Sequence, residues 1–151
     1  MAAALVLGVL LGPIVLRQSQ SLPLMSANGR VIAIKEIETA LMRQPSGAEH
    51  ATDGLAIGMS FRTRNGLLCR TFAMTLGPAG LACREWGEWV IEVLARNPRA
   101  RKGATGEPYL QGGTHFPDVI RMAVEQRMDG APLTAAEEAE ATERAWRASR
   151  P

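Results

Sequence analysis

Residues 55–95 constrain the fold most, because turn signals divide them into short apolar segments. Apolar residues alternate with smaller ones at the start of this stretch, which is the period of a half-buried strand. Asn65-Gly66 favours positive φ and a chain reversal, and two further turn segments follow at 77–80 and 85–88. The pattern therefore predicts an antiparallel meander of four strands, at about residues 55–61, 67–75, 81–84 and 89–94.

The two cysteines lie at nearly equal distances from the predicted turn at residues 77–80. In an antiparallel pair, Cys69 and Cys83 would therefore face each other or miss by one position. Directly opposed residues have Cα atoms about 4.5–5.5 Å apart, a separation that a disulfide spans. We expect a cross-strand disulfide between them. The alternative is a pair of buried free thiols.

No motif that carries catalysis or cofactor binding is found. The chain has no nucleophile elbow, phosphate-binding loop, zinc-protease helix or dinucleotide fingerprint. Two cysteines without a histidine at ligand spacing cannot complete a tetrahedral zinc shell. We therefore expect a protein that is not an enzyme, with no cofactor, no metal and no catalytic residue.

Length and charge narrow the class of protein further. The chain has 151 residues and a formal net charge of +2, with acidic and basic residues interspersed. This length suits one domain with its own core. No basic block is interleaved with aromatic residues, so direct nucleic-acid binding is not indicated. A disulfide in so ordinary a composition points to an oxidising compartment.

The N-terminal segment Ala2–Leu16 contains no charged or polar side chain. A secretory signal peptide, a buried core helix and the outer part of a transmembrane helix are the three interpretations. No basic residue precedes the segment and no clear cleavage site follows it, which disfavours a signal peptide. As a helix it would be about 22 Å long, shorter than the roughly 30 Å hydrocarbon core of a bilayer. We expect residues 1–17 to form a transmembrane helix, possibly truncated at its inner end.

Polar residues 18–29 are interpreted as a spacer, and residues 30–148 as an extracytoplasmic α+β domain. In Arg30–Gln44, apolar residues recur at helical spacing and predict an amphipathic helix packed on the sheet. A second helix is predicted from Pro117 to Gly130 after a long connection. Thr134 and Glu137 form a capping-box pattern that opens a last helix, up to Ala148. The expected fold is thus an N-terminal transmembrane helix followed by a four-stranded meander with flanking helices.

A resemblance rests on the motif residues of the meander. They are Phe61-Arg62, Asn65-Gly66, Cys69-Arg70, Phe72, Gly80-Leu81-Ala82-Cys83-Arg84 and Trp89, followed near the C-terminus by Trp146-Arg147. This pattern resembles the extracytoplasmic domain of membrane-anchored anti-sigma factors of α-proteobacterial type. It covers residues 1–16 and 55–147.

The resemblance implies a single-pass inner-membrane protein whose C-terminal domain lies in the periplasm and senses or transmits envelope stress. It implies an envelope ligand or a protease as partner, besides the inner membrane. A sigma factor would be bound by a cytoplasmic segment before the membrane helix. No such segment precedes Met1, so the chain as written is not expected to sequester a sigma factor itself.

The alternative is an exported envelope module that resembles a surface antigen or lipoprotein and has a structural or binding role without regulatory output. Such proteins often carry a lipidated cysteine after the signal and a glycine zipper. No cysteine follows the apolar segment here, which disfavours this alternative.

Overall fold

Six strands form one antiparallel sheet in the order β1-β2-β6-β5-β4-β3. The computed structural model describes residues 23–47, 52, 54–97 and 116–148. The strands are β1 (Leu24–Ala27), β2 (Arg30–Ala33), β3 (Leu55–Arg62), β4 (Leu68–Met74), β5 (Pro78–Glu85) and β6 (Glu88–Arg96). The helices are α1 (Lys35–Arg43), α2 (Asp118–Arg127) and α3 (Ala135–Glu143).

The prediction of a four-stranded sheet is wrong, because a further hairpin extends the meander. Asn28 and Gly29 both adopt positive φ, at 51° and 72°, and join β1 to β2 in a tight turn. Strand β2 then pairs with β6 through Ile32 and Val90. The predicted helix over Arg30–Gln44 is accordingly shorter, because its first residues belong to β2. Strand β1 lies in the stretch interpreted as a spacer.

The expected transmembrane helix is also corrected. No helix within residues 23–47, 54–97 and 116–148 is long and apolar enough to cross a membrane. Helices α1, α2 and α3 have 9, 10 and 9 residues, or about 13–15 Å at 1.5 Å per residue, which is half of a bilayer core. Residues 1–17 and most of the long connection at 97–113 lie outside the described residues. The described fold is therefore a six-stranded sheet with three short helices.

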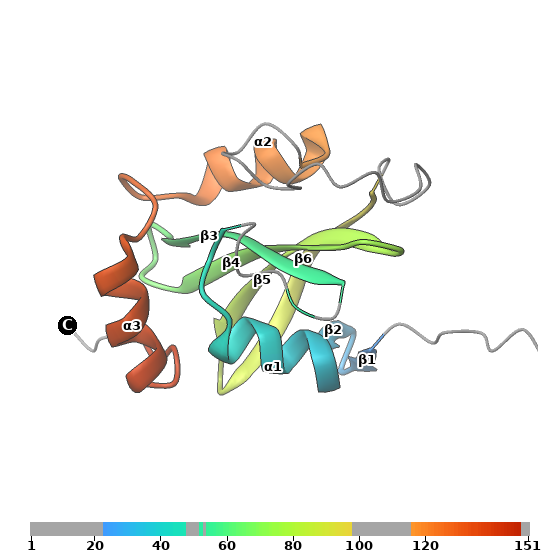
Figure 1. Cartoon of the computed structure of the whole chain (residues 1–151), viewed down its shortest axis with the longest axis horizontal. Coiled ribbons are helices and arrows are strands. Elements are labelled where there is room, and N and C mark those ends of the chain that lie inside the picture. The colour runs from blue at the N-terminus through green and yellow to red at the C-terminus, as the bar shows by residue number, and fades with distance from the viewer. Residues whose placement is uncertain (1–22, 48–51, 53, 98–115, 149–151) are drawn as a thin grey trace, which may run out of the picture.

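The helices cover both faces of the sheet. Figure 1 shows α1 on one face, α2 on the opposite face and α3 at one end of the molecule. Ile37 and Leu41 of α1 belong to one core cluster. Ile120 and Val124 of α2 belong to the other, on the far side of the sheet. Strand β4, which lies inside the sheet, is thus covered on both faces and has no exposed residue.

Two irregularities in pairing let single strands supply both cores. The register of β3 on β4 shifts between Ile57 and Ser60. As a result, Ile57 packs in the α1 core whereas Phe61 packs in the α2 core. Strand β6 behaves alike, with Trp89 in the α1 core and Val93 against the α2 core. A strict period of two along these strands would have placed all these side chains on one face.

The outer edge of β3 is covered by backbone from two other segments. Gly47 N–H donates to Ile57 C=O (2.9 Å), and Leu133 N–H donates to Ser60 C=O (2.7 Å). Asp129 N–H donates to Arg62 C=O (2.8 Å). The turn after α1 and the link between α2 and α3 therefore satisfy carbonyls that an edge strand would otherwise expose.

Candidate functional site

A groove of about 1110 Å³ lies beside α1. It runs between this helix, the start of β3 and the end of β4. The groove is lined by Pro23, Lys35, Glu36, Thr39, Ala40, Arg43, Gln44, Pro45, Thr52, Gly54, Leu55, Met74, Thr75 and Leu76. This volume is slightly above the roughly 300–1,000 Å³ that is typical of small-molecule sites.

The two walls of the groove differ in character. Helix α1 contributes polar and charged side chains, among them Lys35 and Arg43. The opposite wall is more apolar and includes Met74 and Leu76, of which Leu76 is 81% exposed. A ligand that suits these walls has an apolar body and a polar or charged edge.

Directly beneath the C-terminal end of α1 lies the buried guanidinium of Arg70. Its Nη1 donates to Leu41 C=O (2.8 Å) and its Nη2 to Gln44 C=O (2.7 Å). Its Nε donates to Ser60 Oγ (2.8 Å) on the neighbouring strand β3. The last carbonyls of a helix have no partner within the helix and favour a cation. Arg70 therefore caps α1 from below and ties it to the sheet.

The C-terminal segment packs against the same arginine. The Arg70 guanidinium carbon lies 4.2 Å from the centre of the Trp146 ring. Trp146 Nε1 also donates to Met42 C=O (3.0 Å), which adds a second cap to α1. Glu138 of α3 lies 3.7 Å from Arg70 Nη2 and accepts from Ser46 N–H (3.0 Å). Strand β4, helix α1 and helix α3 thus meet at one cation.

Burial is the main electrostatic effect at this cation. Removal of the guanidinium from water lowers the pKa of Arg70 to about 10, and the charge of Glu138 acts in the opposite direction. The side chain still carries its charge at neutral pH. Its hydrogen bonds to carbonyl oxygens and the Trp146 ring compensate part of the desolvation cost.

The groove and the arginine share Ala40 of α1 and Gln44, which directly follows this helix. Ala40 and Gln44 line the groove, and their carbonyl oxygens accept from Arg70 at 3.5 and 2.7 Å. If a ligand in the groove displaced α1, it would therefore change the hydrogen bonds of Arg70. It would also change the contacts of Arg70 with Trp146 and α3.

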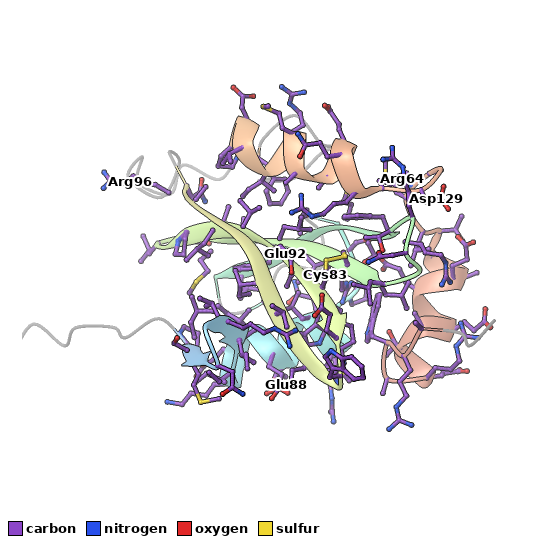
Figure 2. The ribbon with its side chains drawn as sticks, turned by 180° about the vertical axis from the view of Figure 1, so that it is seen from behind. Arg64, Cys83, Glu88, Glu92, Arg96 and Asp129 are labelled. Carbon is purple, nitrogen blue, oxygen red and sulfur yellow. A yellow bond between two sulfur atoms is a disulfide. The ribbon has the colours of Figure 1, made fainter. Side chains whose placement is uncertain are left out.

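The predicted disulfide is confirmed. Cys69 and Cys83 are direct partners in the register of β4 and β5, with Cα atoms 4.0 Å apart, and they are bonded. Such a bond is typical of proteins from an oxidising compartment. The bond lies on the α2 face of the sheet, away from the groove, and Figure 2 shows Glu92 near Cys83. Cys83 also contributes to a small hollow of about 300 Å³, together with Arg64 and Arg127.

The role of Arg70 as a buried cap of α1 was not predicted from the sequence, although a signal was present. It stands between Leu68 and Phe72, and a period of two places all three on the same buried face. An arginine at such a position must be paired inside the protein. The groove and Trp146 had no comparable signal, because the tryptophan lies 104 residues from its acceptor.

Within the described ranges, no group of histidine, cysteine, aspartate or glutamate side chains is placed to hold a metal ion. Both histidines, His50 and His115, lie outside these ranges.

No protein-family model, curated protein or solved structure matches this chain. The resemblance to anti-sigma factors therefore rests on the motif residues alone. Among them, Cys69-Arg70 and Cys83-Arg84 have structural roles that can be stated. The two cysteines bridge β4 and β5, and the two arginines contact Trp146 and Trp89.

Proposed function

We propose that this chain is an extracytoplasmic sensory domain of the kind found in anti-sigma factors, and that it acts by binding a ligand rather than by catalysis. The disulfide supports a location in the periplasm, where such bonds form and persist. The motif residues that carry the resemblance support a regulatory rather than a purely structural role.

The observation that carries the proposal is the sharing of Ala40 and Gln44 between the groove and Arg70. A ligand in the groove contacts α1 on its exposed side. The other side of the same helix is held by Arg70 and Trp146. Binding in the groove would therefore change how firmly α3 is held, which is a physical route from ligand to output.

The test is a comparison of transcripts in the native cell with and without the gene. A regulatory domain predicts that deletion changes a limited set of stress-response transcripts. The wild-type gene should restore them, and a Thr39→Trp variant, which fills the groove from α1, should not. Met122→Trp is the matched control, because Met122 is 51% exposed on α2, on the other face.

Unchanged transcripts together with increased sensitivity to detergent would contradict the regulatory proposal. That result would favour the alternative, an exported structural or binding module of the envelope. If the Thr39→Trp variant restored the transcripts as well as the wild-type gene does, the groove would not be the ligand site.

A further inference from the structure

A second arginine, Arg84 on β5, differs from Arg70 because its buried donors have no hydrogen-bond partner. Four buried side-chain nitrogen or oxygen atoms in the described part of the chain have no hydrogen-bond partner, and two of them are Nε and Nη1 of Arg84. Arg70, by contrast, donates to four oxygen atoms. Buried polar atoms are paired in the great majority of cases, so unpaired donors on a guanidinium require an explanation.

The third unpaired atom is a donor in the same place. It is the indole Nε1 of Trp89, a residue with no exposed surface. Arg84 and Trp89 are direct partners in the register of β5 and β6, and the Arg84 guanidinium carbon lies 5.6 Å from the centre of the Trp89 ring. The fourth atom is an acceptor, Glu138 Oε1 on α3. The three unpaired donors therefore all belong to the Arg84–Trp89 pair of the β5–β6 hairpin.

The charged residues around Arg84 affect its pKa but do not form an ion pair with it. Burial lowers the pKa of Arg84, and the Glu38 carboxylate opposes this effect. Arg147 lowers the pKa further, and Glu88 raises it. None of these carboxylates forms an ion pair with Arg84 among the described residues. Figure 2 shows Glu88 at the turn end of this hairpin, where it precedes Trp89 in the chain. Arg84 as a residue is half-buried, whereas its Nε and Nη1 atoms are buried.

We propose that Arg84 and the Trp89 indole N–H form a binding site for an oxyanion, a carboxylate or a phosphate group. Guanidinium and indole N–H groups are donors only, and arginine forms its strongest hydrogen bonds to carboxylate and phosphate oxygens. The site is separate from the groove beside α1, since Arg84 and Trp89 do not line that groove. It stands or falls independently of the regulatory proposal.

The core supplies a built-in reporter for this site. Trp89 and Trp146 have ring centres 5.6 Å apart, with Arg84 over the Trp89 ring and Arg70 over the Trp146 ring. An anion that draws on Arg84 and Trp89 changes the surroundings of the indole directly. Trp86 is the third tryptophan and is 92% exposed, so Trp86→Phe removes the background emission.

The experiment is a fluorescence titration of the full chain carrying Trp86→Phe, at pH 7 and constant ionic strength set with chloride. Acetate and inorganic phosphate are the two probes. We expect a saturable change in tryptophan emission with at least one of them. The anion that saturates at the lower concentration shows whether the site prefers a carboxylate or a phosphate group. Arg84→Gln should weaken binding roughly tenfold to a hundredfold, because charge-assisted hydrogen bonds are lost.

Arg121→Gln, on the exposed side of α2, is the matched control and should bind as the parent does. If Arg84→Gln does not fold, Arg84→Lys tests the same point by keeping the charge and removing the planar donors. A linear response to both anions, or a saturable response that survives in the Arg84 variant, overturns the proposal.

Discussion

The Arg70 guanidinium lies against the Trp146 ring, with 4.2 Å from its central carbon to the ring centre. One residue belongs to the second strand of the meander and the other to the C-terminal segment beyond α3. Between them they donate hydrogen bonds to the carbonyls of Ala40, Leu41 and Met42 in α1 and of Gln44 directly after it. The position of α1, and hence one wall of the groove, depends on this contact.

Replacement of Arg70 should therefore be among the most destabilising single changes in the chain. Arg70→Met leaves the Leu41 and Gln44 carbonyls without their donor and the buried Glu138 carboxylate without its counter-charge. We expect a loss of about 3 kcal/mol or more in the free energy of unfolding, measured by urea denaturation. Arg121→Met is the control and should change stability by less than about 0.5 kcal/mol, since Arg121 is exposed. A small effect of Arg70→Met would show that the methionine packs as well as the ion.

The disulfide should stabilise the sheet substantially. It joins residues 14 positions apart, and the loop-entropy model assigns about 3 kcal/mol to a closed loop of this size. Replacing both Cys69 and Cys83 by alanine should lower the melting temperature by about 6–12 °C. A thiol reductant should lower it to a similar extent in the wild-type protein and have no effect on the double variant. Equal melting temperatures of all forms would contradict a stabilising role.

The capping box of α3 should respond to acid. The backbone N–H of Thr134 donates to Glu137 Oε2 at 2.7 Å, and its hydroxyl donates at 2.8 Å. These bonds hold the pKa of Glu137 below its usual value of 4.5. A depressed carboxyl pKa means that the stabilisation is complete above pH 4.5 and is lost as pH falls through the lower, folded-state pKa.

Nuclear magnetic resonance titration of the Glu137 side chain, with amide exchange along α3, measures this effect. Thr134→Ala removes the hydroxyl donor and should raise the pKa of Glu137 part of the way to 4.5. Thr142→Ala is the control, because its hydroxyl donates to the Glu138 carbonyl inside the helix. An unchanged Glu137 titration in Thr134→Ala would contradict the assigned cause.

Gly80 should not tolerate a side chain. It pairs with Phe72 across β4 and β5, and a Cβ at this position would lie 2.5 Å from the Phe72 ring and 2.9 Å from the Val93 carbonyl oxygen. Gly80→Ala therefore forces a core ring or a strand backbone to move, at a cost of about 1–3 kcal/mol. Gly80→Ala combined with Phe72→Leu should recover part of the loss in thermal unfolding. No recovery would assign the strain to the Val93 carbonyl instead.

The local parts of the fold could be predicted from the sequence because their signals are local. Turn residues and short apolar runs located β3 to β6, and equal spacing from a turn identified the partner of Cys69. The capping box at Thr134 was likewise visible and is confirmed. The β1–β2 hairpin carried an equally local signal in Asn28-Gly29, which was interpreted as part of a spacer.

The remaining features depend on contacts between distant segments. Register shifts in β3 and β6 divide their side chains between two cores, and no periodicity reveals such a shift in advance. The surroundings of Arg70 come from residues 41, 44, 60, 138 and 146. The groove exists only because α1 is held over the ends of β3 and β4. None of these arrangements follows from composition or spacing.

The covering of β3 also decides how this sheet can join another. Its carbonyls at Ile57, Ser60 and Arg62 are occupied by Gly47, Leu133 and Asp129, whereas within the described residues no strand pairs with the outer side of β1. As far as the described residues go, strand addition is thus possible at the β1 edge only. Two copies that met there would use up both available edges at once, so association through this sheet would stop at a symmetric pair instead of growing into a fibre.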